Sequence, residues 1–252
     1  MADILKAVSV YNSFDNKNEK NVVLQNIDFE IQEGEFVTIM GPSGCGKSTL
    51  LYALSGMEKI KEGSVFLDGE EISSQSEEKL ARLRRDKIGY IFQQPTMIRS
   101  MNLIDNIVVT SVLKERSKQK EIKAKAILLM KKTGISDLAQ RGTNEVSGGQ
   151  LQRAGICRAP MNCPKIIFGD EPTGALNSVA ASEILDIIAM IHQEGTTILL
   201  ATHDVKVAAR RERVVFMKDG EIVKQIILPK NQECSQQEKI ELIDKEVKAF
   251  MI

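Results

Sequence analysis

A short glycine-rich segment has the residue types and the spacing of a polyphosphate site. Gly41, Gly46, Lys47 and Ser48 fit the pattern of a glycine, four residues of any type, a second glycine, a lysine and then serine or threonine. In such a loop the backbone N–H groups surround an anion, the lysine reaches the outer phosphates, and the hydroxyl binds Mg²⁺. The candidate binding residues are Gly41, Ser43, Gly44, Cys45, Gly46, Lys47, Ser48 and Thr49. The segment predicts a site for a polyphosphate and its magnesium ion.

The glycine-rich segment lies between an expected strand and an expected helix. Residues 36–40 are apolar and include β-branched side chains, which indicates a buried strand. Residues 49–54 are good helix formers, and Gly56 can close this helix as its C-terminal cap. A helix that begins at the loop adds its positive N-terminal end to the anion site. This context favours a functional loop over a chance match.

A second segment supplies the carboxylates that phosphate chemistry needs. A run of mainly apolar residues, 165–169, leads up to Asp170, which we expect at the end of a buried strand, where it would orient Mg²⁺. Glu171 follows and points elsewhere along a strand, so it is the candidate general base that polarises an attacking water. Adjacent acids more often form a solvated turn, but the apolar run and Pro172 favour the functional interpretation.

The chain between these two segments is longer than one strand-helix-strand path requires, so it contains an insertion. Helical spacing across residues 102–134 is shown by Leu103, Ile107, Val108, Ile122, Ala126, Leu129 and Met130. Further along, a serine and two glycines precede an expected helix at 151–156, and this forms a second anion site at Ser147, Gly148, Gly149 and Gln150. A single nucleotide site does not need two such helix ends.

Together these motifs resemble the ATP-binding cassette ATPases, from Tyr11 to about Lys224. The segment Val146–Gln150 is similar to the signature motif of that family, although valine stands where leucine is commoner. The resemblance implies a head-to-tail homodimer that forms on ATP binding and buries two ATP molecules. In that arrangement the signature of each copy completes the ATP site of the other, which accounts for the second anion site.

The resemblance also implies roles for single residues. Gln93 would sense Mg²⁺ and the γ-phosphate and link the core to the helical insertion, and His203 would contact the γ-phosphate. Tyr11 matches the aromatic residue that stacks on adenine, with Phe14 as a neighbouring alternative. The implied catalytic residues are Glu171, His203, Gln93 and Lys47, and the implied metal ligands are Ser48, Gln93 and Asp170. The implied cofactors are ATP and Mg²⁺.

The expected fold is α/β, with a P-loop ATPase core built on a mainly parallel sheet, an antiparallel β subdomain and an inserted α-helical subdomain. We expect an ATPase domain over residues 1–228, with its core at 1–93 and 163–228 and its helical subdomain at about 94–162. The antiparallel part is expected near the N-terminus as a hairpin, with a polar loop from Asn12 to Asn21.

The C-terminal residues 229–252 are expected to form an amphipathic helix. A capping box is expected at Ser235 and Glu238, and an apolar stripe is formed by Ile240, Ile243, Val247 and Phe250. Packing of this helix on the chain's own core is favoured over docking to a partner.

Several details test the resemblance. Gly174 and Asn177 stand where serine and aspartate are usual in the loop that contacts the partner copy, although Asn177 can still form a hydrogen bond. Pro160 predicts that the helix after the signature ends near Ala159. Cys45 lies beside a helix N-terminus, which predicts a lowered pKa and a reactive thiol; burial by loop packing is the alternative.

Composition excludes some classes of function. The chain has 252 residues, 42% of them hydrophobic and 4% aromatic, and its formal net charge is zero, so we expect one large domain with a smaller lobe and no binding of nucleic acid. No apolar run approaches the roughly 18 residues that cross a bilayer. We expect a cytoplasmic protein, peripheral on the inner face of the cell membrane, that works with a separate transmembrane permease.

Within the family, the residues of the segments Val146–Gln150 and Gly169–Asn177 most resemble those of the branch that serves lipoprotein release, macrolide export and antimicrobial-peptide resistance. The resemblance implies an ATP-hydrolysing subunit of the export or extraction type, with permease contact near Gln94–Asn106. The alternative is the ATPase lever of a sensing or cell-division membrane complex that transports nothing. A member that acts in translation or DNA repair is disfavoured, because the sequence has no second cassette and no long coiled-coil insertion.

Overall fold

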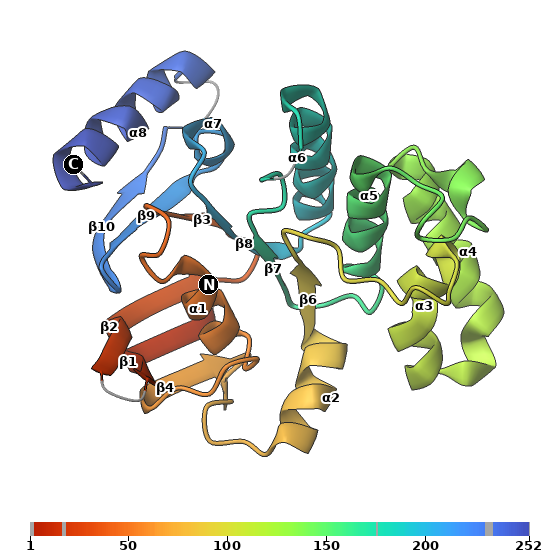
Figure 1. Cartoon of the computed structure of the whole chain (residues 1–252), viewed down its shortest axis with the longest axis horizontal. Helices are drawn as coiled ribbons and strands as arrows, with labels where there is room; N and C mark the ends of the chain where they lie inside the picture. Colours follow the sequence, from red (N-terminus) through yellow and green to blue (C-terminus); the bar gives the residue numbers. More distant parts are fainter. Residues whose placement is uncertain (1–2, 17–18, 175, 230–233, 252) are drawn as a thin grey trace. The chain divides into compact units, whose positions relative to one another are not determined.

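The computed structural model describes residues 3–16, 19–174, 176–229 and 234–251, and its elements are drawn in Figure 1. The chain divides into two compact units: unit 1 comprises Met1–Ala81 and Thr197–Ile252, and unit 2 comprises Arg82–Thr196. The predicted α/β class is confirmed, with parallel and antiparallel strands and an inserted group of helices. The domain limits given above stay a prediction.

Unit 1 contains an antiparallel sheet with the strand order β2-β1-β4-β5. Its strands are β1 (Asp3–Asn16), β2 (Glu19–Gln32), β4 (Glu62–Leu67) and β5 (Glu70–Glu71). The predicted hairpin is present, but the expected loop from Asn12 to Asn21 is wrong, because Asn12 pairs with Leu24 and the ladder continues to Asn16 and Glu19. A ladder needs only backbone N–H and C=O groups, so polar side chains do not end it.

The second set of strands in unit 1 carries the phosphate loop. Its order is β10-β9-β3-β8, with β3 (Phe36–Met40), β8 (Thr197–Thr202), β9 (Arg213–Lys218) and β10 (Glu221–Ile227). β3 pairs in parallel with both β8 and β9, while β10 pairs antiparallel to β9. Every residue of β3 and β8 is buried, as is typical of central parallel strands with continuous apolar sequences.

Helices complete the core of unit 1. Those that lie wholly within its described residues are α1 (Lys47–Leu54), α7 (Val205–Ala208) and α8 (Gln236–Met251). The predicted capping box precedes α8, since the N–H of Ser235 donates to Glu238 Oε2 at 2.7 Å and the N–H of Glu238 donates to Ser235 Oγ at 3.3 Å. Ile243 of α8 is fully buried in a cluster with Ala208 and Phe216, and Figure 1 shows α8 beside α7. As predicted, α8 packs on the core of its own unit.

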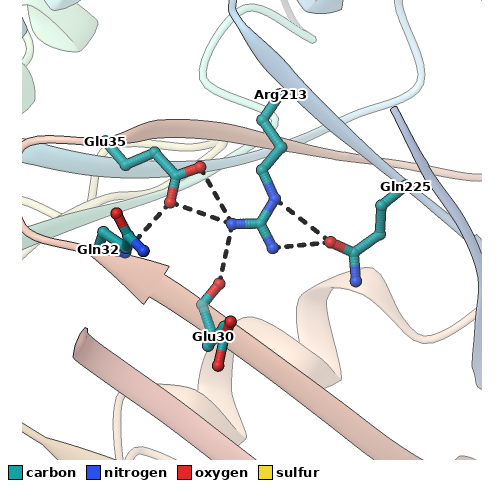
Figure 2. Close-up of polar contacts among 5 residues, drawn as sticks. All are labelled: Glu30, Gln32, Glu35, Arg213 and Gln225. Atoms are coloured by element: carbon teal, nitrogen blue, oxygen red, sulfur yellow. Dashed lines mark hydrogen bonds and ion pairs between the residues drawn. The ribbon is translucent and has the colours of Figure 1, made fainter. Parts of the chain in front are cut away.

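One arginine of β9 connects β2 of the antiparallel sheet with β10 through hydrogen bonds (Figure 2). Arg213 Nη1 donates to both carboxylate oxygens of Glu35 at 3.0 Å and to the carbonyl of Glu30 at 3.0 Å. Its Nη2 donates to Gln225 Oε1 at 2.7 Å, and the N–H of Gln32 donates to Glu35. The planar guanidinium thereby joins three strands around the segment that leads into β3.

Unit 2 contains two parallel strands and the inserted helices. Its elements are β6 (Ile88–Ile91), α3 (Leu103–Lys114), a 3₁₀ turn (Arg116–Lys118), α4 (Gln119–Lys132), a second 3₁₀ turn (Ser136–Leu138), α5 (Gly148–Arg158), β7 (Ile166–Asp170) and α6 (Ser178–Gln193), while α2 (Glu77–Lys87) crosses the division between the units. Leu103, Ile107, Ala126 and Met130 are buried together between α3, α4 and α5, which lie side by side in Figure 1. The predicted helical insertion is therefore confirmed.

Candidate functional site

The phosphate loop of unit 1 runs from the end of β3 to the start of α1. Gly46 is the N-cap of α1 and has φ 102°, and a Cβ at this position would lie 2.7 Å from the carbonyl oxygen of Val23. Only glycine accommodates both this backbone conformation and this close approach. The carbonyl of Cys45 accepts a hydrogen bond from the N–H of Gly220 at 3.1 Å. The phosphate loop thus packs against β2 and forms a hydrogen bond with the turn between β9 and β10.

Lys47 lies inside this loop. Its side chain is 6% exposed, and Nζ donates to the carbonyl oxygens of Gly41 at 2.8 Å and Pro42 at 2.9 Å. Ser43, Gly44 and Ser48 are exposed. A buried ammonium held by two neutral carbonyls is a strong binding point for an anion, since a phosphate oxygen would interact with it more favourably than either carbonyl does.

Cys45 differs from its prediction. Its thiol is buried, with 4% of the residue exposed, and burial raises the pKa of Cys45 above its ordinary value against the opposing effects of Lys47 and of backbone N–H donors. The expectation of a lowered pKa is therefore wrong. The helix N-terminus favours the thiolate, but the cost of removing the thiolate from water by burial is the larger effect.

Two more predicted residues lie in unit 1. Met40 of β3 pairs in parallel with Thr202 of β8, so His203 follows β8 at the same sheet edge at which the phosphate loop follows β3. His203 is exposed, and Asp204 next to it caps α7 by accepting a hydrogen bond from Lys206 N–H at 2.8 Å. Tyr11 is half-buried in β1.

In unit 2 the structure brings Gln93 and Glu171 together. β6 and β7 are parallel, with Ile91 opposite Gly169, so the residues after them leave the sheet at the same edge. A Cβ at Gly174 would lie 3.0 Å from Gln93 Nε2 and 3.4 Å from Glu171 Oε2. Both side chains therefore face the space beside Gly174. Sequence reasoning treated Gly174 only as a departure from the family pattern and missed that it leaves room for these two groups.

The two adjacent carboxylates differ in burial and in backbone conformation. Asp170 is the last residue of β7 and is 7% exposed. Glu171 is less buried and has φ 41°, a left-handed conformation that is rare for glutamate. Such backbone strain is concentrated at functional positions.

The signature segment begins α5. Ser147 is the N-cap, its Oγ accepts a hydrogen bond from Gln150 N–H at 3.3 Å, and its own N–H donates to Gln150 Oε1 at 2.9 Å. Ser147 and Gly148 are exposed, so the first turn of α5 is open to a ligand. The helix ends at Arg158 with Ala159 as its C-cap, as Pro160 predicted.

Comparison with known proteins supports the interpretation of these motifs. Residues 24–174 match the family model described as ABC transporter. The chain is 39% identical over 225 residues to the bacitracin export ATP-binding protein BceA of Halalkalibacterium halodurans, covering 88% of each chain. It is 37% identical over 208 residues to the lipoprotein-releasing system ATP-binding protein LolD 1 of Chlorobium chlorochromatii, covering 82% of this chain and 85% of the relative.

A solved structure agrees with the fold. The ATP-binding cassette MJ0796 of Methanocaldococcus jannaschii, described as a dimer in a post-hydrolysis state with ADP and Pi, superposes with a TM-score of 0.84 at 35% identity, covering 90% of this chain and 99% of that one. The chain therefore belongs to the ABC transporter family, as an ATP-binding cassette, and the predicted family is confirmed. In the part of the chain that the structure describes, no helix is long and apolar enough to cross a bilayer.

Proposed function

We propose that the chain is the ATP-hydrolysing subunit of an ABC transporter of the export or extraction type, and that it dimerises on two Mg-ATP to drive a separate membrane permease. The observation that carries the proposal is the buried ammonium of Lys47, held by two carbonyls inside a glycine loop. Membership of the ABC transporter family supports it.

The proposed division of labour follows from the chemistry of the side chains. The loop N–H groups and Lys47 bind the phosphates, and Tyr11 stacks on adenine. Oxygen ligands suited to Mg²⁺ are available on Ser48, Gln93 and Asp170. When bound, this ion would neutralise charge on the phosphates.

Hydrolysis breaks the bond between the γ-phosphorus and its bridging oxygen, and a water oxygen replaces that oxygen. Glu171 accepts the proton of this water, Gln93 orients it, and His203 and Lys47 stabilise the charge of the transferred group. The shared position of Gln93 and Glu171 beside Gly174 supports their joint action on one water. Catalysis on this account rests on positioning and charge neutralisation.

The second nucleotide contact would come from a second copy of the chain. Ser147, Gly148, Gly149 and Gln150 form an open helix N-terminus that suits a phosphate group. The dimeric form in which the MJ0796 cassette was solved supports a dimer here.

The permease would contact the segment Gln94–Asn106. A cavity of about 390 Å³ in unit 2 includes residues of this segment and three arginines, and is lined by Arg84, Arg85, Tyr90, Phe92, Thr96, Ile98 and Arg158 among others. The names of BceA and LolD support an antimicrobial peptide or a lipoprotein as the substrate, and that of a further relative, the macrolide export protein MacB, supports a macrolide. Binding to the permease would place the chain on the inner face of the membrane.

The test is a Mg-ATPase assay on the purified chain and two variants. We expect hydrolysis by the wild type, a fall of about 100-fold or more in turnover for Glu171→Gln with ATP binding retained, and weakened ATP binding for Lys47→Ala. Unchanged turnover in Glu171→Gln would exclude Glu171 as the base. Absence of ATP binding by the wild type would refute the proposal as a whole.

A further inference from the structure

A buried glutamine in α5 joins the two loops that carry Gln93 and Glu171. Gln152 is 2% exposed, and its Nε2 donates to the carbonyl oxygen of Phe92 at 3.0 Å and to that of Pro172 at 2.9 Å. Phe92 directly precedes Gln93, and Pro172 directly follows Glu171. One amide group thus holds the backbone on both sides of the space beside Gly174.

The residue type at position 152 is explained by these two donors. Both partners are carbonyl oxygens, which only accept, so the nitrogen of the amide must face them. The other end of the amide, Oε1, is buried and has no hydrogen-bond partner among the residues that the structure describes. A methionine or leucine would fill the same volume without leaving a buried acceptor unpaired, which is costly. The position therefore requires hydrogen-bond donors and not only packing.

A second side chain of α5 holds the other end of the loop that carries Gln93. Arg158 lies six residues after Gln152, and its Nη1 donates to the carbonyl of Thr96 at 2.6 Å. Between them, Gly155 allows close approach, since a Cβ there would lie 3.4 Å from Pro95 Cβ. Residues three apart are neighbours on a helix surface, so Gly155 lies between the other two positions. The loop from Phe92 to Thr96 is therefore fixed along the helix that begins with the signature.

We infer that Gln152 is a positioning residue, which keeps Gln93 and Glu171 in fixed relation to each other and to the signature helix. This inference rests on the proposed function, because it takes Gln93 and Glu171 as the groups that act on the water. Gln152 itself touches neither side chain in the contacts above and acts through the backbone at Phe92 and Pro172. Without its donors, the carbonyls of Phe92 and Pro172 lose these hydrogen bonds, the second of them buried, and both loops become free to shift.

Hydrogen exchange tests the inference without requiring hydrolysis. In Gln152→Met, amide exchange around Gln93 and around Glu171, including the N–H of Gly174 that donates to the Glu171 carbonyl at 3.0 Å, is expected to be about tenfold faster than in the wild type. Thr133→Val is the matched control, because Thr133 is buried and its Oγ1 contacts Cys157 of α5 and donates to the carbonyls of Leu129 and Met130 of α4. The hydrogen bond that Arg153 of α5 donates to the backbone carbonyl of Thr133 is kept in this variant.

In the control, exchange in both loops should stay within about twofold of the wild type. Wild-type exchange in Gln152→Met, or equal acceleration in Thr133→Val, would overturn the inference. Gln152→Asn keeps the amide on a side chain that is one methylene shorter, so we expect it to keep at most one of the two hydrogen bonds and to give an intermediate result. It also serves as the test variant if Gln152→Met does not fold.

Steady-state kinetics give a second readout. We expect the kcat of Gln152→Met to fall about tenfold while its KM for ATP changes less than about twofold, because the phosphate loop does not depend on this amide. A fall in kcat accompanied by a comparable rise in KM for ATP would assign Gln152 a general structural role instead. So would a fall in the kcat of Thr133→Val as large as that of Gln152→Met. If the wild type does not hydrolyse ATP, the proposed function fails, whereas the exchange result still decides the role of Gln152.

Discussion

At the scale of single residues, burial controls the ionisation of the thiols. Cys157 of α5 is 1% exposed, and burial raises its pKa from an ordinary value of 9.0 to about 11, against the opposing effect of the hydrogen bond with Thr133. Cys45 in the phosphate loop has a raised pKa for the same reason. Both thiols are therefore protonated and unreactive at neutral pH in the folded chain.

Cys157 predicts a loss of stability in alkali. Because the unfolded thiol ionises near pH 9 and the folded thiol only near pH 11, the unfolded state loses its proton first as the pH rises. The stabilisation present at lower pH is then lost between these values, and the free energy of unfolding falls by about 2 to 3 kcal/mol. Urea unfolding at pH 8 and pH 10.5 measures about 2 kcal/mol of this fall, because the folded thiol is still mostly protonated at the higher pH.

Cys157→Ala should show a smaller fall between the two pH values than the wild type, whatever its stability at pH 8. Cys163→Ser, at an exposed cysteine, is the control and should behave as the wild type does. An equal fall in Cys157→Ala and in the wild type would show that other groups cause the alkaline destabilisation.

The sequence was sufficient to identify residues whose role follows from the strand or helix next to them along the chain. The phosphate loop follows a strand and precedes a helix, and Asp170 ends a strand, so the pattern along the chain was sufficient for these elements. Gly174 and Gln152 were not found, because their importance depends on contacts with residues far away in the sequence. Cys45 was misjudged for a related reason, since its burial arises from tertiary packing.

At the scale of elements, side-chain caps determine where helices begin. Asn177 is the N-cap of α6, and its Oδ1 accepts a hydrogen bond from the N–H of Ala180 at 2.9 Å. The hydrogen-bonding capacity expected for Asn177 is thus used within its own chain. Asparagine and aspartate are among the best residues for this position.

Removal of this cap should destabilise the chain. Asn177→Ala is expected to lower the free energy of unfolding by about 1 kcal/mol and the midpoint of thermal unfolding by about 2 to 4 °C. Asn177→Asp keeps a cap acceptor and adds a negative charge at a helix N-terminus, so it should be at least as stable as the wild type. Calorimetry of the three proteins decides, and a loss in Asn177→Asp as large as that in Asn177→Ala would contradict the capping role.

The extent of the strands in the antiparallel sheet could not be predicted from the sequence. The helices α3 and α4 were visible from their apolar spacing, but the full length of β1 was not. Its register shifts, for example between Ala7 and Val10, interrupt the alternation of apolar and polar residues that identifies a strand. Asn12 and Ser13 are polar yet buried, which removes the signal further.

For the molecule as a whole, the proposed ATP site needs residues of a second copy of the chain. Those residues are the signature segment Ser147, Gly148, Gly149 and Gln150, which forms the open N-terminus of α5. A cassette that hydrolyses ATP in this way is complete only when two chains meet. Dimerisation that depends on bound ATP is therefore the central claim.

Sedimentation velocity of Glu171→Gln with and without Mg-ATP tests this claim most directly. Glutamine keeps the size of the side chain but cannot accept the proton of the attacking water, so ATP should remain bound and uncleaved. We expect a monomer without nucleotide, a dimer containing two ATP molecules with it, and a monomer under both conditions for the double variant that also carries Lys47→Ala. A Glu171→Gln protein that binds ATP and yet stays monomeric would exclude dimerisation driven by ATP.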